Sequence, residues 1–167
     1  MYFFSGDCHY GHFNIIRYCA RPFSTAQEMN DEIIRRHNEV VKDGDVVIHV
    51  GDFSFQPREK YVRQLNGSHV FLRGNHDHKN DKFYGDIWER TIEGQKIVCS
   101  HYSLRVWNAS HYNSWNLYGH SHGKLPPIGK SWDVGVDNNN FYPVSFTKLT
   151  EIMANRPDNS NLIAKRY

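Results

Sequence analysis

The sequence predicts an α/β protein, on two observations. Short apolar runs alternate with helix-like segments through the first half of the chain, a pattern typical of α/β folds. The second half contains short strand-like runs separated by turns, which predicts mostly hairpins. A length of 167 residues suits one hydrophobic core, and no repeat, linker or composition shift divides the chain. We therefore expect a single domain over residues 1–167.

Three strands and three helices are expected in the first half. Each strand is a short apolar run followed by a glycine turn, and the runs cover residues 2–4, 45–50 and 70–72. The helices are expected at residues 13–18, 25–41 and 57–65. The long one begins with a capping-box pattern, Thr25 to Glu28, places Met29 and Ile33 on one face, and ends before Gly44.

The second half is predicted to consist mainly of strands. A hairpin is expected around Glu93-Gly94, and Asn138–Asn140 is interpreted as a turn. The predicted strands are residues 87–92, 95–100, 114–118, 132–136 and 142–146, and a short helix follows at 147–154. From Asn155 onward the chain is polar, and we expect it to be loose.

Composition limits the class of protein. The net charge is +2, and lysines and arginines are scattered, so a dedicated nucleic-acid-binding patch is not expected, whereas a nucleotide substrate is compatible. No apolar run has the length of a membrane span, and the N-terminus lacks a signal pattern. Because a candidate ligand, Asp7, lies so near the start, we expect no cleaved leader and a cytoplasmic location. The three cysteines include no CxxC pair and are expected to be reduced and mostly buried.

Polar clusters follow five of the predicted strands and predict a metal site. Eleven histidines are more than packing requires in a chain of this length. The clusters are Asp7-x-His9, Gly51-Asp52, Gly74-Asn75-His76-Asp77, Ser100-His101 and Gly119-His120-x-His122. They offer at least seven oxygen and nitrogen ligands, namely Asp7, His9, Asp52, Asn75, His101, His120 and His122. Since one zinc ion needs only three or four protein ligands, this set indicates two divalent metals that share a carboxylate.

The order of these clusters resembles the calcineurin-like metallophosphoesterase family. The resemblance covers residues 7–122. The local sequences around His9-Tyr10-Gly11-His12 and Tyr118-Gly119-His120 are similar to those of small bacterial and phage members. It implies a four-layer αββα sandwich, in which two mixed sheets are flanked by helices and the metals lie between strand-end loops. Cys8 occupies the variable position of the first motif, and Ser100 stands where many members have glycine.

The resemblance also implies a role for each motif residue. Asp7, His9 and His122 are expected to hold one metal; Asn75, His101 and His120 are expected to hold the other. Asp52 would bridge the two metals. His76, oriented by Asp77, would contact the phosphate and protonate the leaving oxygen, and Asn75 would help to stabilise the transition state.

Physical chemistry supports the same reaction independently. Two metals acidify a bridging water, so that a hydroxide attacks phosphorus while the cations and Asn75 offset charge on the phosphate oxygens. A free histidine has a pKa near 6.5, which suits His76 as the general acid. Manganese is the first expectation for the metal, and iron, nickel and zinc suit the same ligands.

Several other polar residues are assigned weaker roles. Candidate substrate contacts are His12, Arg73, Arg105 and His111, and Trp115 lies on the segment that would line the entrance. Arg73 is equally compatible with a surface salt bridge, and His12 with simple loop polarity. Trp107 and Trp115 are better explained as packing residues. His49 is expected in the core, and His37, His69 and His78 are interpreted as ordinary polar residues.

The predicted function is a metal-dependent phosphoesterase. We expect a phosphodiesterase acting on nucleotide-type or other small diesters, because an open site without a cap suits diesters. A phosphomonoesterase and a nuclease are alternatives, although the absence of a basic patch disfavours the nuclease. A non-catalytic scaffold on the same fold is a third alternative, disfavoured by the complete ligand set with His76 and Asp77. The sequence leaves the substrate and the oligomeric state open.

Overall fold

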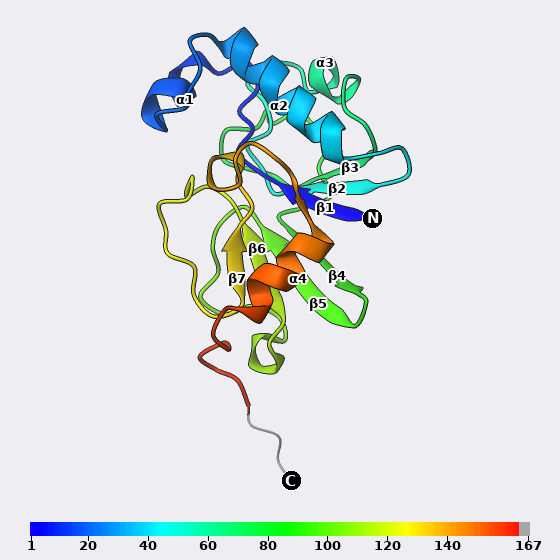
Figure 1. Cartoon of the computed structure of the whole chain (residues 1–167), viewed down its shortest axis with the longest axis vertical. Coiled ribbons are helices and arrows are strands. Elements are labelled where there is room, and N and C mark those ends of the chain that lie inside the picture. The colour runs from blue at the N-terminus through cyan, green and yellow to red at the C-terminus, as the bar shows by residue number, and fades with distance from the viewer. Residues whose placement is uncertain (164–167) are drawn as a thin grey trace.

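Two four-stranded β-sheets pack against each other in the computed structural model, which describes residues 1–163 (Figure 1). The first sheet has the order β3-β2-β1-β8, and the second has the order β4-β5-β6-β7. The strands of the first sheet are β1 (Tyr2–Ser5), β2 (Val46–His49), β3 (Ser68–Phe71) and β8 (Val144–Ser145). Those of the second are β4 (Ile87–Ile92), β5 (Gln95–Ser100), β6 (Trp115–Tyr118) and β7 (Ser131–Asp133).

Both sheets are mixed. β1, β2 and β3 are parallel, and β8 pairs antiparallel with β1. In the second sheet β4 and β5 form the predicted hairpin, whereas β5, β6 and β7 are parallel. The prediction that the second half consists mostly of hairpins is therefore wrong. The cause lies in the connections: about a dozen residues are needed to return a chain for parallel pairing, and the segments after β5 and β6 have that length.

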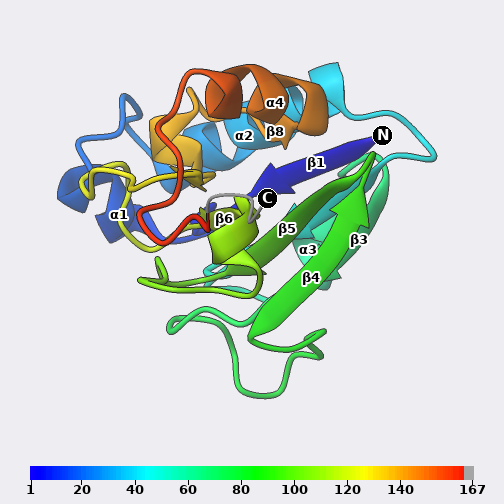
Figure 2. The same ribbon diagram turned by 90° about the horizontal axis from the view of Figure 1, so that it is seen from below.

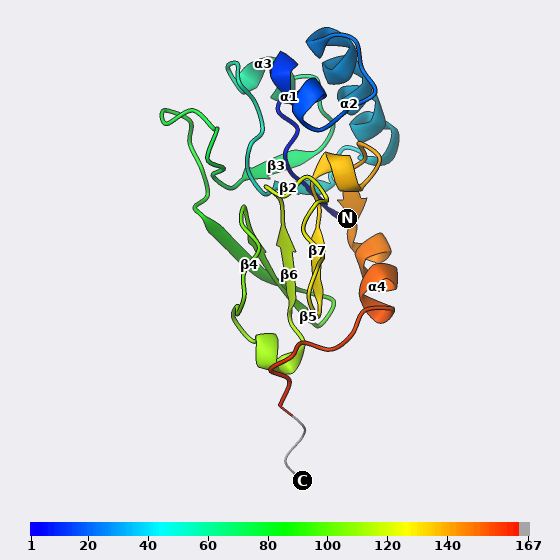
Figure 3. The same cartoon turned by 90° about the vertical axis from the view of Figure 1, so that its left-hand side faces the viewer.

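Helices flank the first sheet. α1 (Phe13–Tyr18), α2 (Ala26–Val40) and α3 (Glu59–Val62) lie on its side away from the second sheet (Figure 3). α4 (Phe146–Ala154) lies beside β8 and β1 (Figure 2). Two short 3-10 turns, η1 (Ser110–Tyr112) and η2 (Val136–Asn138), occur in the connections of the second half. The predicted class, two mixed sheets with flanking helices, is confirmed.

The capping pattern at the start of α2 is present. The Thr25 hydroxyl accepts a hydrogen bond from the Glu28 backbone N–H at 3.1 Å, and the Glu28 carboxylate accepts one from Ser24 N–H at 2.8 Å. Met29 and Ile33 are both buried, at 0% and 2% exposure. The helix therefore begins and faces inward as its sequence pattern predicts.

The main core lies between the two sheets. Ile48 of β2 and Leu72, directly after β3, pack in one cluster with Ile97 and Leu117 from the second sheet, and Leu149 of α4 belongs to the same cluster. Each such fully buried side chain contributes about 1.5–3 kcal/mol of hydrophobic stabilisation. This core holds the two sheets in a fixed relation, so the loops at their ends are held as well.

Three histidines, of which His37 and His49 are buried and His69 is half-buried, form a group between α2 and the first sheet. His49 is buried, as expected, and its Nε2 lies 3.1 Å from Nδ1 of His69. His37, interpreted from sequence as an ordinary polar residue, is also buried and hydrogen-bonds the Asn66 carbonyl through Nε2 at 3.0 Å. The ring centroids of His37 and His69 are 5.6 Å apart. The interpretation of His37 as an ordinary polar residue is wrong, because the apolar face of α2 carries it onto the sheet, and His69 is half-buried beside it.

The C-terminal segment is anchored at Arg156 and Asn159, contrary to the expectation that it is loose from Asn155 onward. Asn159 is buried, and its side-chain amide donates to the carbonyls of Ser110 and Ser114 at 2.9 and 3.0 Å. The Arg156 guanidinium donates to the Pro127 carbonyl at 2.6 Å. These bonds satisfy backbone groups of the loops beside the second sheet. Residues 164–167, also part of the predicted loose tail, lie outside the described residues.

Two further expectations concern the cysteines and membranes. All three cysteines are free thiols, and Cys8 and Cys99 are buried. Within residues 1–163, none of the helices has both the length and the apolar character that crossing a membrane requires.

Candidate metal centre

The polar residues that follow β1, β2, β3, β5 and β6 come together where these strands end. Parallel pairing places the C-terminal ends of β1, β2 and β3 at one edge of the first sheet, and those of β5 and β6 at one edge of the second. Backbone bonds join the loops: Asp7 N–H donates to Gly51 O at 3.1 Å, and Gly119 N–H donates to His101 O at 3.0 Å. The predicted convergence of the clusters is therefore present.

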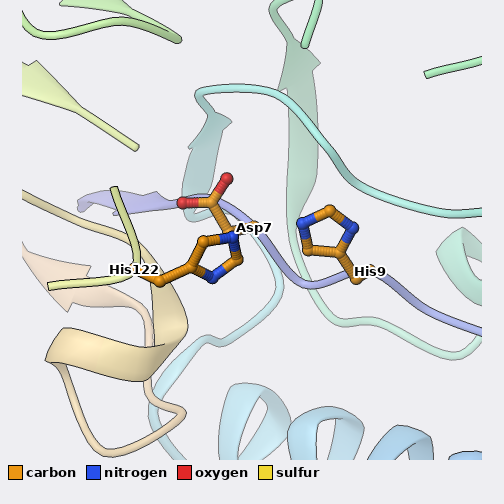
Figure 4. Close-up of side chains that lie close together, drawn as sticks. All are labelled: Asp7, His9 and His122. Carbon is orange, nitrogen blue, oxygen red and sulfur yellow. The ribbon is translucent and has the colours of Figure 1, made fainter. Parts of the chain in front are cut away.

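A first group of ligand atoms comes from the loops after β1 and β6. One ligand atom from each of Asp7, His9 and His122 lies within 4.8 Å of the other two (Figure 4). Asp7 and His9 are buried, and the His9 and His122 rings are stacked with centroids 5.3 Å apart. Two imidazoles and a carboxylate at this spacing match a divalent-metal ligand set.

A second group comes from the loops after β2, β5 and β6. Ligand atoms of Asp52, His101 and His120 also lie within 4.8 Å of one another. Asn75 joins them, because its Oδ1 lies 2.9 Å from Nε2 of His101. All seven predicted ligands are thus brought into two adjacent groups.

Asp52 lies between the two groups. Its Oδ2 is 3.7 Å from Nε2 of His9 in the first group and 3.5 Å from Nε2 of His101 in the second. Its Oδ1 accepts a hydrogen bond from the His76 backbone N–H at 2.8 Å, which fixes the carboxylate. A carboxylate in this position is able to contact cations in both groups at once.

Unpaired buried atoms test whether cations fit the site. Within the described chain, Asp7 Oδ1 and both ring nitrogens of His9 have no hydrogen-bond partner, although Asp7 is 0% and His9 2% exposed. An unpaired buried polar group costs about 1–3 kcal/mol, and more when it is charged. A cation beside these residues would satisfy Asp7 Oδ1 and the one ring nitrogen of His9 that carries a lone pair, so the residues fit a divalent metal.

The tautomer of His101 supports the same fit. Its Nδ1 lies 3.0 Å from the Val50 carbonyl oxygen, which only accepts hydrogen bonds, so Nδ1 carries the hydrogen. In the neutral ring, Nε2 then presents a lone pair toward Asn75 Oδ1 and Asp52 Oδ2. Three lone pairs that converge repel one another unless a cation lies among them.

The clustered carboxylates make the site one that favours a cation. Burial raises the pKa of Asp7 well above its ordinary value, and the neighbouring Asp133 and Asp52 carboxylates raise it further. Burial lowers the pKa of His9 to about 2, and nearby cationic groups add to this effect. His9 is therefore neutral and available as a ligand, while the crowded carboxylates favour a bound cation.

Most of the ligand residues have left-handed backbone conformations. Positive φ angles occur at Asp7 (54°), His9 (52°), Asp52 (52°), His120 (65°) and His122 (48°). Such conformations are uncommon outside glycine and cost on the order of 1 kcal/mol each. They turn the chain sharply after each strand and direct successive side chains into the same space.

Two motif glycines leave room for the carboxylates. A Cβ on Gly74 would collide with Oδ1 and the backbone N of Asp52. A Cβ on Gly119 would lie 2.7 Å from Asp7 Oδ2. These close approaches explain why glycine precedes the polar residues at both positions.

The His76 side chain is exposed at the site, whereas the Asp77 carboxylate is bound by backbone N–H groups. His76 is exposed, and its ring centroid lies 5.8 Å from that of His9. The Asp77 carboxylate accepts backbone N–H groups of Asp52, Phe53 and Gly74 at 2.9, 2.8 and 2.8 Å. The orientation of His76 by Asp77 stays a prediction. Through these three bonds the Asp77 carboxylate ties the loop after β3 to the loop after β2.

Sequence reasoning missed a buried ion pair beside the first group. Asp137 Oδ2 lies 2.7 Å from His122 Nδ1, and the Arg21 guanidinium contacts both Asp137 oxygens at 2.8 and 2.7 Å. Arg21 also donates to the carbonyl of Asp7 at 2.7 Å. Asp137 follows a predicted strand, as the other clusters do, and that position was the available signal. Arg21 has no comparable signal in the sequence.

Two of the four candidate substrate contacts lie at the site. His12 stacks on Phe55 with ring centroids 3.9 Å apart, and its centroid lies 5.7 Å from that of His9. Arg73 lines a pocket together with Asn75 and His101. Both residues are therefore near the two ligand groups.

The other two candidates lie elsewhere. Arg105 lines a separate cavity with Trp107 and Asn159, and His111 lies on η1, where its backbone carbonyl bonds Ile163. The expectation that they line the entrance is wrong. Because β5 and β6 are parallel, the connection between them runs back to the opposite end of the sheet from the site. Trp107 and Trp115 are buried packing residues, as expected.

Comparisons with known proteins agree with this arrangement. The family model described as calcineurin-like phosphoesterase matches residues 2–162. An uncharacterized protein of Methanocaldococcus jannaschii, MJ1445, is 35% identical over 161 residues, which cover 88% of each chain. The crystal structure of a protein of unknown function from Aquifex aeolicus, AQ665, superposes with a TM-score of 0.71 at 21% identity, covering 91% of this chain and 98% of that one. The structural likeness shows a shared fold, and the match over nearly the whole chain shows that this protein belongs to the metal-dependent calcineurin-like phosphoesterase family.

Proposed function

We propose that the protein is a dinuclear metal-dependent phosphodiesterase that acts on small, nucleotide-type diesters. The position of Asp52 between two ligand groups is the observation that carries this proposal. One metal would be held by Asp7, His9 and His122, and the other by Asn75, His101 and His120, with Asp52 contacting both. Manganese is the first candidate, and the nitrogen and oxygen ligands also suit iron, nickel or zinc. Bound metals would supply Lewis acidity toward the phosphate and acidify a water molecule.

The chain's own residues supply the remaining functions. Asp77 holds the loop after β3 against the loop after β2, which fixes Asn75 and His76 relative to Asp52. The Asn75 side-chain amide lies at the exposed mouth of the second group, where its N–H donors are able to bind a phosphate oxygen. Fixed donors of this kind stabilise charge that grows on the phosphate in the transition state.

His76 is the proposed general acid. Its backbone is anchored by the bond to Asp52 Oδ1, while its imidazole is exposed beside the first ligand group. A protonated imidazole there is able to give its proton to the departing oxygen.

The surroundings of the site favour a diester over a monoester. Asn75, His76 and His120 are exposed, so the mouth is open to a substrate with groups on both sides of the phosphate. Arg73 is the arginine that lines the pocket beside Asn75 and His101. A monoester carries about two negative charges at neutral pH, and a dianion would benefit from more cationic side chains than a diester monoanion requires.

A paired hydrolysis assay tests the proposal. Bis-p-nitrophenyl phosphate and p-nitrophenyl phosphate are each offered to wild-type protein with added manganese and with a chelator. Asp52→Asn is the test variant, and Asp43→Asn is the matched control, because Asp43 is exposed in the turn between α2 and β2. We expect manganese-dependent turnover of the diester, lost in Asp52→Asn and retained in Asp43→Asn.

The other outcomes contradict the proposal in different ways. Turnover of the monoester alone would replace the phosphodiesterase with a phosphatase. Two bound metals without turnover of either substrate would favour the scaffold alternative. Failure to bind metal would contradict the dinuclear centre itself.

A further inference from the structure

A pocket of about 460 Å³ opens beside the second ligand group. Its lining includes the two proposed ligands Asn75 and His101, together with Arg73, Asp86, Ile87, Tyr102 and Leu104. This volume falls within the range of pockets that hold small organic ligands. Because two of its lining residues are proposed metal ligands, a group that fills the pocket would lie next to a phosphate bound at the metal centre.

The wall of the pocket on the second sheet is rigid. Asn116 is 0% exposed, and its Oδ1 accepts the Leu104 backbone N–H at 3.1 Å while its Nδ2 donates to the Val98 carbonyl at 3.2 Å. The Ser100 hydroxyl donates to the Tyr102 carbonyl at 2.9 Å. The segment 100–104 is thus fixed by side chains that lie beneath it, so the pocket exists before a ligand binds.

Tyr102 gives the pocket an aromatic surface at the metal centre. Its ring lies edge-on to two predicted ligands, with centroid distances of 5.0 Å to His101 and 4.7 Å to His120. The side chain is nevertheless 51% exposed, and Ile87 across the pocket is 48% exposed. Large exposed apolar side chains around one pocket indicate a planar apolar group that covers them on binding.

Polar side chains of opposite charge complete the lining. The Arg73 guanidinium is held over the Phe83 ring at 5.2 Å, and both Arg73 and the Asp86 carboxylate are exposed at the pocket. Arg73 offers hydrogen-bond donors, and Asp86 offers acceptors. A planar group with both donors and acceptors on its edge matches this lining better than a purely hydrocarbon ring does.

We infer that this pocket is a subsite for a nucleobase, or a similar nitrogen heterocycle, carried by the phosphoester substrate. The inference rests on the proposed function, because it needs the phosphate to lie at the two ligand groups. Tyr102 stacks on the face of the heterocycle, and Ile87 and Leu104 make apolar contacts with it. Arg73 and Asp86 hydrogen-bond the donors and acceptors on its edge. Within the nucleotide-type diesters already proposed, the inference places the base in this pocket, beside Tyr102.

Calorimetric titration of the manganese-loaded protein tests the subsite. Three probes share a phosphate group: adenosine 5′-monophosphate, ribose 5-phosphate, which lacks the base, and inorganic phosphate. Base stacking on an aromatic side chain predicts that the nucleotide binds about tenfold more tightly than ribose 5-phosphate. Tyr102→Ala and Leu104→Trp, which fills the pocket, should bring that ratio close to 1, and Tyr102→Phe should retain it.

The matched control is Tyr112→Ala. Tyr112 is 70% exposed on η1, at the opposite end of β6 from His120, so the ratio should be unchanged in this variant. Equal binding of the nucleotide and ribose 5-phosphate by wild type, or an undiminished ratio in Tyr102→Ala and Leu104→Trp, would overturn the inference while inorganic phosphate still bound. Failure of all three probes to bind would overturn the proposed function together with the subsite.

Discussion

Asp137 accepts a hydrogen bond from Nδ1 of His122 at 2.7 Å, and this bond leaves Nε2 of the imidazole free to face Asp7 and His9. The side chain of Arg21, which binds the other face of the carboxylate, is 0% exposed, so the pair is shielded from solvent. Burial raises the pKa of Asp137, but the hydrogen bonds from His122 and Arg21, together with the positive charge of Arg21, lower it below its ordinary value. The carboxylate is therefore ionised and holds His122 in one tautomer.

Replacing Asp137 should weaken metal binding at the first group. In Asp137→Asn the acceptor loses its charge, and we expect metal affinity to fall about 10–100-fold, as for other residues that orient metal ligands. The measurement is calorimetric titration with manganese, in which one of two binding events should weaken. Asp137→Glu should recover part of the affinity, and Asp43→Asn should behave as wild type. Equal affinity in Asp137→Asn and wild type would contradict the orienting role.

Replacing His76 should slow the reaction without removing the metals. We expect His76→Ala to lower kcat about 10²–10⁴-fold, because a general acid contributes in this range. The loss should be greater for a diester with an alkyl leaving group than for bis-p-nitrophenyl phosphate, whose leaving group needs little protonation. Metal content should stay at the wild-type value, and His78→Ala, which alters an exposed neighbour, is the control. An equal loss for both leaving groups would show that His76 acts otherwise than as an acid.

Adding one methyl group at Gly74 should disrupt the centre. In Gly74→Ala the new Cβ collides with Asp52, so we expect destabilisation of more than about 2 kcal/mol together with loss of the second metal. The control is Gly44→Ala, where nothing lies within 4 Å and only the positive φ of 90° is unfavourable, at a cost of about 1 kcal/mol. Urea unfolding of both variants gives the comparison. Equal destabilisation of the two would mean that the close approach to Asp52 is unimportant.

Acid should destabilise the fold through the histidine group between α2 and the first sheet. Burial lowers the pKa of His69 to about 4, and it lowers the pKa values of His37 and His49 as well, with Arg58 adding to the effect on His49. Between the unfolded pKa near 6.5 and the lower folded values, the unfolded state binds more protons. Stability is therefore complete above about pH 6.5 and falls as the pH decreases through this window, by up to about 1.4 kcal/mol per pH unit for each group.

Urea unfolding at pH 7.5 and pH 5 measures this dependence. His69→Gln should reduce the difference in unfolding free energy between the two pH values, and His111→Gln on η1 should leave it unchanged. A wild-type stability that stays constant over this range would exclude the histidine group as the cause.

The predictable part of the molecule is the part in which local pattern determines structure. The capping pattern at Thr25 and the alternation of strands with polar clusters locate α2 and all seven proposed ligands, because these signals act over a few residues. Parallel pairing of β5 with β6 is decided by the whole sheet, so the sequence pattern led to hairpins and to the misplacement of Arg105 and His111.

Polar contacts between residues far apart in the chain could not be predicted from the sequence either. Arg21 and Asp137 are 116 residues apart in the sequence, and His37 contacts the loop at Asn66 across 29 residues. Nothing in either local sequence specifies such a partner. Asp77 lies within the recognised motif, and yet its three backbone partners depend on the closeness of β2 and β3.

The left-handed backbone conformations of five proposed ligands serve the metal centre but lower the stability of the fold. At about 1 kcal/mol each, they amount to a substantial part of the 5–15 kcal/mol that stabilises an ordinary domain. Glycine at Asp7, His9, Asp52, His120 or His122 would relax the chain while removing a metal ligand. A library of variants selected only for heat resistance should therefore lose these five side chains early, and the positions it discards would outline the catalytic centre without any assay of activity.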